Sequence, residues 1–268
     1  MDAQVPGAVA SYYQQKITWT SCGSERSYCG TVEVPADWSA PAGDKLKIAL
    51  AYHQADAAKP LGSVIFNPGG PGVSGVSWIK DSIDQIGTPQ LRKNFNIVGF
   101  DPRGVGLSEP KIKCFNAKDT DELLYGDSGF QVASDADIAY TTAKMKKFAD
   151  ACAKNTGPNL AFVDTVSVAK DLDLIRAVFG SQKINYLGFS YGTFIGAVYA
   201  QLFTDRVDRM VLDGAVDPTQ NADQQNLAQL RGFDKALKNF LADCLDNQDC
   251  PFHGSITQAQ ERISKLLR

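Results

Sequence analysis

The chain has 268 residues, 44% of them hydrophobic, so it can bury a full core in one large domain or in a domain with a lid. Its 27 basic and 30 acidic residues give a net charge of −3, which argues against nucleic acid or an anionic membrane as a partner. No apolar run approaches the length of a membrane-spanning helix. The polar start Met1-Asp2-Ala3-Gln4 is not an export signal, and we expect that such a signal has been removed.

Two N-terminal segments, Gly30–Pro35 and Leu46–Gln54, are predicted to be antiparallel strands joined by a turn at Pro41-Ala42-Gly43. A parallel block begins with the short buried strand Ser63-Val64-Ile65-Phe66. The loop Asn67-Pro68-Gly69-Gly70-Pro71-Gly72 follows directly, and its glycines let the backbone approach a ligand. No Lys-Ser or Lys-Thr closes this loop as a phosphate-binding loop requires, and no G-x-G-x-x-G opens a helix for a dinucleotide.

The next strand, 96–100, precedes a second glycine-containing loop, Asp101 to Ser108. We interpret Asp101 and Arg103 as an ion pair that locks this turn rather than as catalytic groups. Short helices are predicted over 74–86 and 89–95, between the strands 63–66 and 96–100. After Ser108 we expect an exposed polar excursion over 119–135 and longer helices over 136–155 and 164–179, the last capped by Asp164.

The most specific motif is Gly188-Phe189-Ser190-Tyr191-Gly192, which lies between the predicted strand 183–187 and an apolar helix over 193–203. Strand, G-x-S-x-G and helix in this order are typical of the nucleophile elbow of α/β-hydrolases, and a glycine-rich turn of a Rossmann-like unit is the alternative. In such an elbow Ser190 is the nucleophile. The oxyanion hole is then formed by the backbone amides of Tyr191 and, from the earlier glycine loop, Gly70.

A sixth strand over 207–212 ends the core, which we place at residues 1–217. We interpret residues 218–268 as the beginning of a helical lid, whose apolar stripe packs as lid core rather than as a groove for a partner. The apolar residues at helical spacing are Leu227, Leu230, Phe233, Leu237, Phe240, Leu241, Ile256, Ile263 and Leu267. The predicted fold class is therefore α/β: an α/β-hydrolase with a mostly parallel sheet flanked by helices, whose last two strands are absent from this chain.

The loops 69–72 and 101–108 and the elbow 188–192 together resemble the prolyl and tripeptidyl aminopeptidases among the α/β-hydrolases, most of all the secreted tripeptidyl aminopeptidases of actinobacteria. Segments 29–35 and 211–218 are also similar to that group, whereas Pro68 stands where many relatives have a histidine. The resemblance implies a secreted or cell-envelope serine peptidase. It would release short peptides from substrates with a free N-terminus through an acyl-enzyme, with no cofactor.

Six cysteines agree with export. Fifteen pairings are possible, and the three bridges between sequence neighbours, Cys22–Cys29, Cys114–Cys152 and Cys244–Cys250, need the least rearrangement. Metal binding is the competing interpretation, for which only His53 and His253 could supply further ligands.

The acid and base of a triad are less evident than the nucleophile. Asp213 and His253 follow Ser190 in the right order, but His253 lies in the predicted lid, and His53 lies upstream on an early strand. We expect an Asp and a His from beyond Arg268, or from a second chain, to complete the site. An esterase or thioesterase of the same fold and a non-catalytic fragment are the alternatives.

Overall fold

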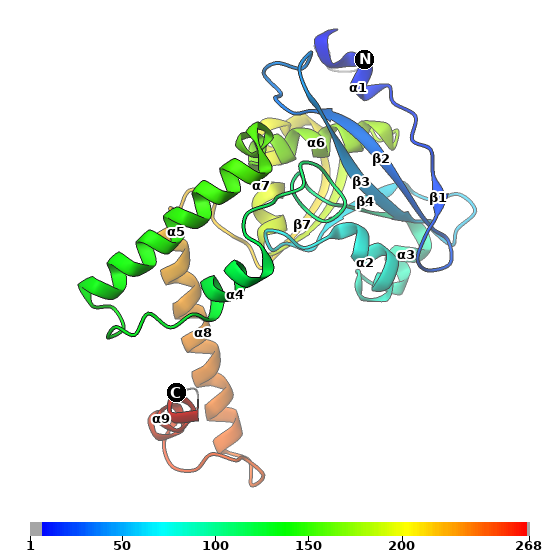
Figure 1. Ribbon diagram of the computed structural model, residues 1–268. Helices are drawn as coiled ribbons and strands as arrows, with labels where there is room; N and C mark the ends of the chain where they lie inside the picture. The colour runs from blue at the N-terminus through cyan, green and yellow to red at the C-terminus, as the bar shows by residue number, and fades with distance from the viewer. Residues whose placement is uncertain (1–6, 267–268) are drawn as a thin grey trace. The chain divides into compact units, whose positions relative to one another are not determined.

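Figure 1 shows the computed structural model of the chain, in which residues 7–266 are described. Backbone contacts divide the chain into two compact units, Met1–Val216 and Asp217–Arg268. The first unit contains a sheet with helices on both faces, and the second contains a pair of helices. The division falls beside the boundary at residue 217 drawn from the sequence, and a lid role for the second unit stays a prediction.

The strands of the first unit are β1 (Thr20–Ser21), β2 (Ser27–Pro35), β3 (Lys45–His53), β4 (Ser63–Asn67), β5 (Asn96–Phe100), β6 (Ile184–Phe189) and β7 (Val207–Asp213). Its helices are α1 (Ala10–Tyr13), α2 (Gly75–Asp81), α3 (Pro89–Asn94), α4 (Ala117–Tyr125), α5 (Asp135–Thr156), α6 (Thr165–Val178) and α7 (Tyr191–Leu202). Short 3₁₀ turns are η1 (Gly7–Val9), η2 (Ile83–Gln85), η3 (Pro158–Phe162) and η4 (Thr204–Arg206).

The strands described form one sheet in the order β1-β2-β3-β5-β4-β6-β7. β4 lies parallel to β5 and β6, and β7 lies parallel to β6, whereas the pairs that join β1, β2, β3 and β5 are antiparallel. The predicted α/β-hydrolase sheet is confirmed, including both N-terminal antiparallel strands. The sequence prediction missed β1, because a strand of two residues is too short to show the alternation that identifies strands.

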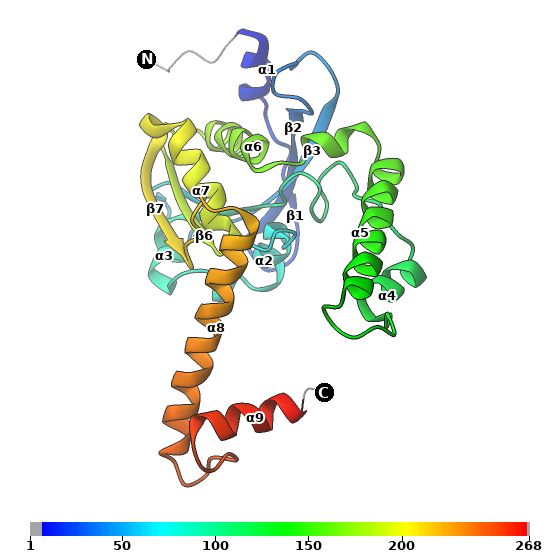
Figure 2. The same cartoon turned by 90° about the vertical axis from the view of Figure 1, so that its left-hand side faces the viewer.

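Both faces of the sheet are covered, as Figure 2 shows for the helices around it. Neighbouring residues of a strand point to opposite faces, so Ile65 joins one apolar cluster while Val64 and Phe66 join the other. α6 and α7 pack on the Ile65 face, and α2 packs on the opposite face. Ala169, Leu172 and Ile175, which lie at helical spacing on one side of α6, are completely buried, whereas Phe179 after the end of the helix is only partly buried.

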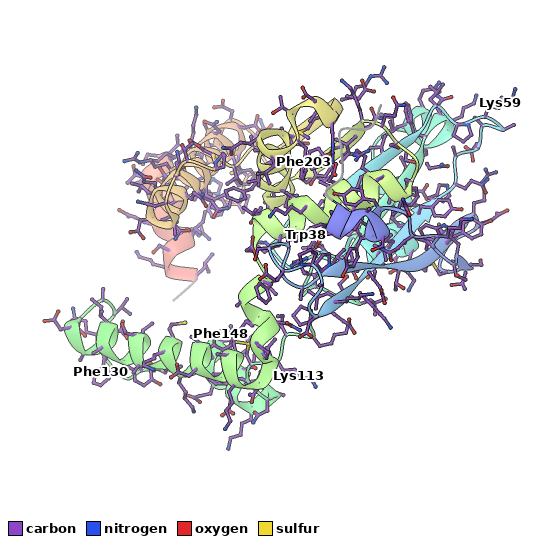
Figure 3. The ribbon with its side chains drawn as sticks, turned by 90° about the horizontal axis from the view of Figure 1, so that it is seen from above. Trp38, Lys59, Lys113, Phe130, Phe148 and Phe203 are labelled. Atoms are coloured by element: carbon purple, nitrogen blue, oxygen red, sulfur yellow. A yellow bond between two sulfur atoms is a disulfide. The ribbon has the colours of Figure 1, made fainter. Side chains whose placement is uncertain are left out.

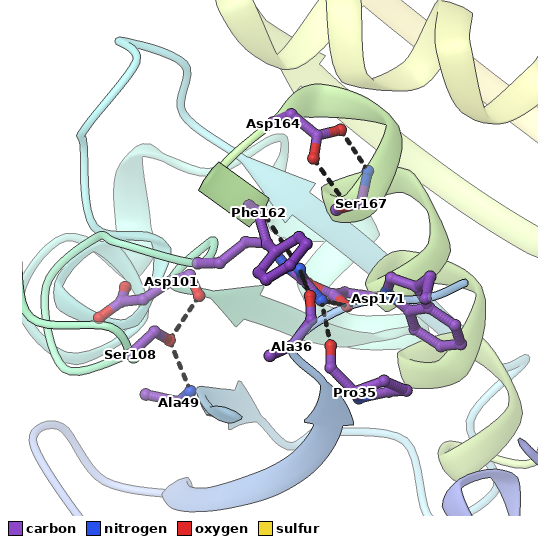
Figure 4. Close-up of polar contacts among 11 residues, drawn as sticks. Pro35, Ala36, Ala49, Asp101, Ser108, Phe162, Asp164, Ser167 and Asp171 are labelled. Atoms are coloured by element: carbon purple, nitrogen blue, oxygen red, sulfur yellow. Dashed lines mark hydrogen bonds and ion pairs between the residues drawn. The ribbon is translucent and has the colours of Figure 1, made fainter. Parts of the chain in front are cut away.

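The expected ion pair between Asp101 and Arg103 is wrong. Arg103 is buried and forms a bidentate ion pair with Asp171 of α6: Nε donates to Oδ2 at 2.7 Å, and Nη2 donates to Oδ1 at 2.8 Å. The remaining guanidinium bonds go to the carbonyls of Pro35, Ala36 and Phe162 (Figure 4). Burial raises the pKa of Asp171, and the guanidinium of Arg103 opposes that shift. Arg103 therefore ties its loop to α6 and β2, because its long side chain reaches a buried carboxylate that needs a cation.

Asp101 instead organises the turn around itself. Its side chain accepts hydrogen bonds from the Ser74 hydroxyl (2.6 Å) and from the backbone N–H groups of Val76 (3.1 Å) and Leu107 (2.8 Å). Its backbone carbonyl accepts a bond of 2.6 Å from Ser108, as Figure 4 shows. Asp101 is therefore a structural residue that joins the start of α2 to the loop after β5.

Residues 114–156 leave the sheet as a hairpin of α4 and α5 (Figure 2). The helix expected over 136–155 is confirmed as α5, but α4 overlaps the segment 119–135, in which the sequence predicted an exposed excursion and no helix. Asn116 caps α4 by accepting the Asp119 N–H at 2.8 Å, and this local signal could have identified the helix. The rings of Phe115 and Phe148 meet near one end of α5, and Phe130 lies at the other end (Figure 3).

The second unit consists of α8 (Ala222–Leu245) and α9 (Ile256–Leu266), joined by a loop. Asn221 and Gln224 form a capping box that begins α8. The stripe predicted to be lid core is mostly not buried: Leu241 is fully buried, whereas Leu227, Leu230, Phe233 and Phe240 are exposed. Within the second unit, the short helix α9 covers only part of this stripe of α8. Leu267 lies outside the described residues.

The three predicted disulfides are confirmed as Cys22–Cys29, Cys114–Cys152 and Cys244–Cys250, and no described cysteine is free. The thiolate metal site considered as the alternative is therefore wrong. Cys114–Cys152 spans 38 residues and closes the base of the α4–α5 hairpin, whereas the other two span 7 and 6.

Replacing both Cys114 and Cys152 with Ser should destabilise the protein most, because this bridge removes the most conformational freedom from the unfolded chain. The loop-closure relation gives a loss of about 4 kcal/mol for this bridge and about 2 kcal/mol for each of the others. Urea unfolding of the three double variants measures the ranking. An equal or larger loss on removal of Cys22–Cys29 would contradict it.

Candidate functional site

Ser190 occupies the sharp turn between β6 and α7, where the sequence predicts the nucleophile. Its backbone has φ 51° and ψ −119°, a conformation that a residue with a side chain rarely adopts. The residue is exposed. Its N–H donates to the carbonyl of Asp213 at the end of β7, at 2.9 Å. The turn thus presents a serine hydroxyl at the carboxyl edge of the parallel strands, where open α/β sheets place their sites.

The glycines on either side of this turn are required by close backbone approach. A Cβ atom on Gly188 would lie 2.5 Å from the carbonyl oxygen of Gly192, and one on Gly192 would lie 2.6 Å from that of Asn67. Contacts this short do not occur with real Cβ atoms, so a larger residue at either position would force the backbone apart. The G-x-S-x-G spacing therefore follows from packing of the elbow against itself and against the end of β4.

The glycine loop after β4 reaches the elbow. β4 and β6 are neighbours, with Asn67 paired to Gly188. A Cβ atom on Gly69 would lie 2.5 Å from the carbonyl oxygen of Phe189 and 3.0 Å from the Cβ of Ser190. The structure therefore brings together the two segments that the sequence predicted to form one site.

Asn67 shapes this loop, and sequence reasoning missed it. It is completely buried, and its Oδ1 accepts the N–H of Gly69 at 3.0 Å. Its Nδ2 is buried without a hydrogen-bond partner among the residues described. Since the Gly69 amide is occupied, the Gly70 amide is the loop's candidate for binding an oxyanion, and Gly70 itself has φ 110°. An Asn directly before Pro-Gly-Gly is a local signal for such a side-chain turn.

Tyr191 is the first residue of α7, and its N–H lies at the positive end of the helix, where the first amides have no partner within the helix. The Tyr191 hydroxyl forms a hydrogen bond of 2.8 Å with Thr165, and burial raises its pKa. The phenol therefore stays neutral near pH 7. Since the hydroxyl is already bonded to Thr165, the backbone amide is the candidate group of Tyr191 for stabilising negative charge.

His53 does not lie near Ser190. It pairs with Ile97 at the beginning of β5, whereas Ser190 follows the end of β6. β5 and β6 both run parallel to β4, so these positions lie at opposite edges of the sheet. His53 instead contacts the buried hydroxyl of Ser27, with 3.2 Å between Nδ1 and Oγ. Its role is structural.

The remaining triad candidates, Asp213 and His253, belong to different units of the chain. Asp213 ends β7 and reaches Ser190 through its backbone carbonyl. His253 is exposed in the loop between α8 and α9 of the second unit.

No group of three or more His, Cys, Asp or Glu side chains in the part of the chain described could hold a metal ion. Across residues 7–266, every helix falls short of the length and hydrophobicity needed to cross a bilayer.

Comparison with known sequences agrees with this site. Residues 62–260 match a family described as alpha/beta hydrolase fold. The chain is 41% identical to "Serine protease Hip1" of Mycobacterium tuberculosis H37Rv (94% of the chain, 50% of the relative). It is 34% identical to "Tripeptidyl aminopeptidase" of Streptomyces lividans (94% and 48%) and 34% identical to "Carboxylesterase B" of M. tuberculosis H37Rv (98% and 52%). The chain therefore spans about half the length of these curated relatives.

His53 should make the stability of this protein depend on pH. Burial is the main cause that lowers its pKa; Arg26 and Arg92 lower it further, against the opposing effect of Asp56 and Asp84. As the pH falls below about 6.5, His53 therefore binds a proton in the unfolded chain before it does so in the folded protein. The free energy of unfolding should decrease from this pH until the pH has passed the lower pKa of His53 in the folded state.

Urea unfolding at several pH values between 5 and 8 tests this, with His53→Gln as the comparison because Gln keeps a polar group beside Ser27. The variant should lose the part of the pH dependence that begins below about pH 6.5. Parallel curves for the two proteins would contradict the assignment to His53.

Proposed function

This chain belongs to the α/β-hydrolase fold family, and on that premise we propose that it is the nucleophile-bearing part of a serine hydrolase. The observation that supports this most directly is the strained, exposed Ser190, held in a strand–turn–helix elbow beside the glycine loop after β4. In this fold the part of the chain that carries the nucleophile also supplies the oxyanion-hole amides. This chain has a candidate for each of them: Ser190 as nucleophile, and the amides of Tyr191 and Gly70.

In the proposed reaction the Ser190 Oγ attacks the carbonyl carbon of the substrate while a histidine takes up its proton. The carbonyl oxygen becomes an oxyanion, which accepts hydrogen bonds from the N–H groups of Tyr191 and Gly70. The intermediate collapses when the leaving group takes the proton from the histidine and departs. Water then attacks the acyl-enzyme in the same way, and Ser190 regains its proton.

The proposed base and its orienting acid come from polypeptide outside this chain. His53 lies at the opposite edge of the sheet from Ser190, and His253 belongs to the separate two-helix unit. The relatives named above are about twice as long as this chain, which supports a further segment that carries an Asp and a His. α8 and α9 would then begin a lid over the site.

We favour an exported aminopeptidase that releases short peptides from the free N-terminus of its substrate. This preference rests on the 34% identity to a protein named tripeptidyl aminopeptidase and the 41% identity to one named serine protease. Three disulfides support an oxidising, extracellular or cell-envelope location.

An esterase is the second candidate, supported by the 34% identity to a protein named carboxylesterase. An elbow and an oxyanion hole serve any acyl transfer, so they do not distinguish amide from ester substrates. Comparing kcat/KM for tripeptide amides with a free N-terminus, the same amides with an acetylated N-terminus, and short-chain esters separates the two. A peptidase of the proposed kind hydrolyses only the first efficiently.

Ser190→Ala in the complete enzyme should lower turnover by roughly four orders of magnitude or more, because no acyl-enzyme can form. A fluorophosphonate probe followed by peptide mass spectrometry should label Ser190 in the wild type and nothing in the variant. Ser39→Ala, which removes an exposed hydroxyl from the loop between β2 and β3, serves as the control and should react normally.

The same probe tests whether the triad is shared between segments. The 268-residue chain alone should not be labelled, and adding the segment with the Asp and His should restore labelling of Ser190. Rapid labelling of the chain alone would show that its own residues complete the triad, and would favour Asp213 and His253. Substantial turnover in Ser190→Ala would place the nucleophile elsewhere and overturn the proposal.

A further inference from the structure

Both backbone polar groups of Ser190 are hydrogen-bonded, the N–H to the end of β7 and the carbonyl to Thr193 of α7. The Ser190 N–H donates directly to the carbonyl of Asp213 at 2.9 Å. Its carbonyl oxygen accepts from Thr193 twice, from the backbone N–H at 2.8 Å and from the side-chain hydroxyl at 2.6 Å. The same hydroxyl accepts the N–H of Val216 at 2.9 Å. Thr193 therefore connects the elbow to the last residue of the first unit.

The direction of these bonds follows from the chemistry of the hydroxyl group. A threonine hydroxyl has one proton and two lone pairs, and the Val216 amide can only donate. The proton of Thr193 is therefore free to bond to the Ser190 carbonyl. Thr193 is buried, which limits the access of water to its hydroxyl.

The carbonyl of Ser190 and the N–H of Tyr191 belong to the same peptide group. Because a peptide is planar and trans, its C=O and N–H point in opposite directions, and fixing one fixes the other. The strained φ of 51° at Ser190 makes this peptide one that needs external support to keep its orientation. A rotation of the peptide that released the carbonyl would also turn the Tyr191 amide away from the position of the oxyanion.

We propose that Thr193 is a positioning residue of the hydrolase reaction. Its hydroxyl holds the carbonyl end of the Ser190–Tyr191 peptide, and thereby aims the Tyr191 N–H at the developing oxyanion. This inference rests on the proposed function. It also gives the segment Asp213–Val216, which leads directly into the second unit, a connection to the oxyanion hole through a single side chain.

The test uses Thr193→Val and Thr193→Ser in the complete enzyme. Val has nearly the shape of Thr but cannot donate to Ser190 or accept from Val216, whereas Ser retains both abilities. Loss of a whole oxyanion donor lowers kcat by about 10²–10³, and Thr193→Val keeps the backbone bond, so kcat should fall by about tenfold. KM should change by less than about twofold, because the donor acts mainly in the transition state.

Two further measurements distinguish a positioning role of Thr193 from a purely structural one. The affinity for a peptide trifluoromethyl ketone, which forms an oxyanion with Ser190, should fall in parallel with kcat, and Thr193→Ser should restore both. Thr204→Val is the matched control, because it removes a hydroxyl bound to the Ala200 carbonyl near the other end of α7. Wild-type kcat and ketone affinity in Thr193→Val, or no recovery in Thr193→Ser, would overturn the inference.

The proposed function and this inference can fail separately. If the wild-type enzyme reacts with fluorophosphonate at Ser190 but Thr193→Val reacts at the same rate, only the inference is wrong. If the wild type does not react, the proposed function is wrong. The ¹H–¹⁵N signals of Tyr191 and Val216 then decide whether Thr193 orients this peptide. Unchanged signals for both amides in Thr193→Val would overturn that role as well.

Discussion

The left-handed backbone of Ser190 is the constraint on which the candidate site depends. A non-glycine residue in this region costs about 1–3 kcal/mol, so the surrounding structure has to hold it. The carbonyl of Asp213 and the hydroxyl of Thr193 do so through hydrogen bonds, and Gly188 and Gly192 leave the space that the tight turn needs. The strained residue is also exposed at the turn, at the beginning of α7.

The order of the strands brings the rest of the site to this turn. β4 lies between β5 and β6, so the loop that follows β4 lies directly beside the elbow after β6. Parallel strands end at one edge, which gathers the loops after β4, β5 and β6 there. The antiparallel β3 runs the other way and carries His53 to the far edge. Topology thus decides which polar residues can cooperate chemically.

Buried charges on α6 anchor distant parts of the first unit. Asp171 binds Arg103 from the loop after β5, and the neighbouring Asp173 accepts hydrogen bonds from Tyr13 near the N-terminus and from Tyr199 on α7. Burial raises the pKa of both tyrosines, so they remain neutral donors. A buried carboxylate is stable only with such partners. These contacts keep α6 and α7 in place behind the elbow.

The sequence by itself determined the features whose cause is local. The elbow around Ser190, the glycine loop after β4 and the cap of α6 at Asp164 all follow from residues close in the chain. The three disulfides follow the order of the cysteines along the sequence, since each joins a cysteine to the next one. Only the tertiary structure decided the partner of Arg103, which lies 68 residues away on α6, and the bond from Val216 to Thr193 across 23 residues. Such partners depend on which elements pack together. Because residue spacing records local periodicity but not the pairing of distant segments, the sequence pattern predicted the nucleophile, and the fold alone revealed what holds it.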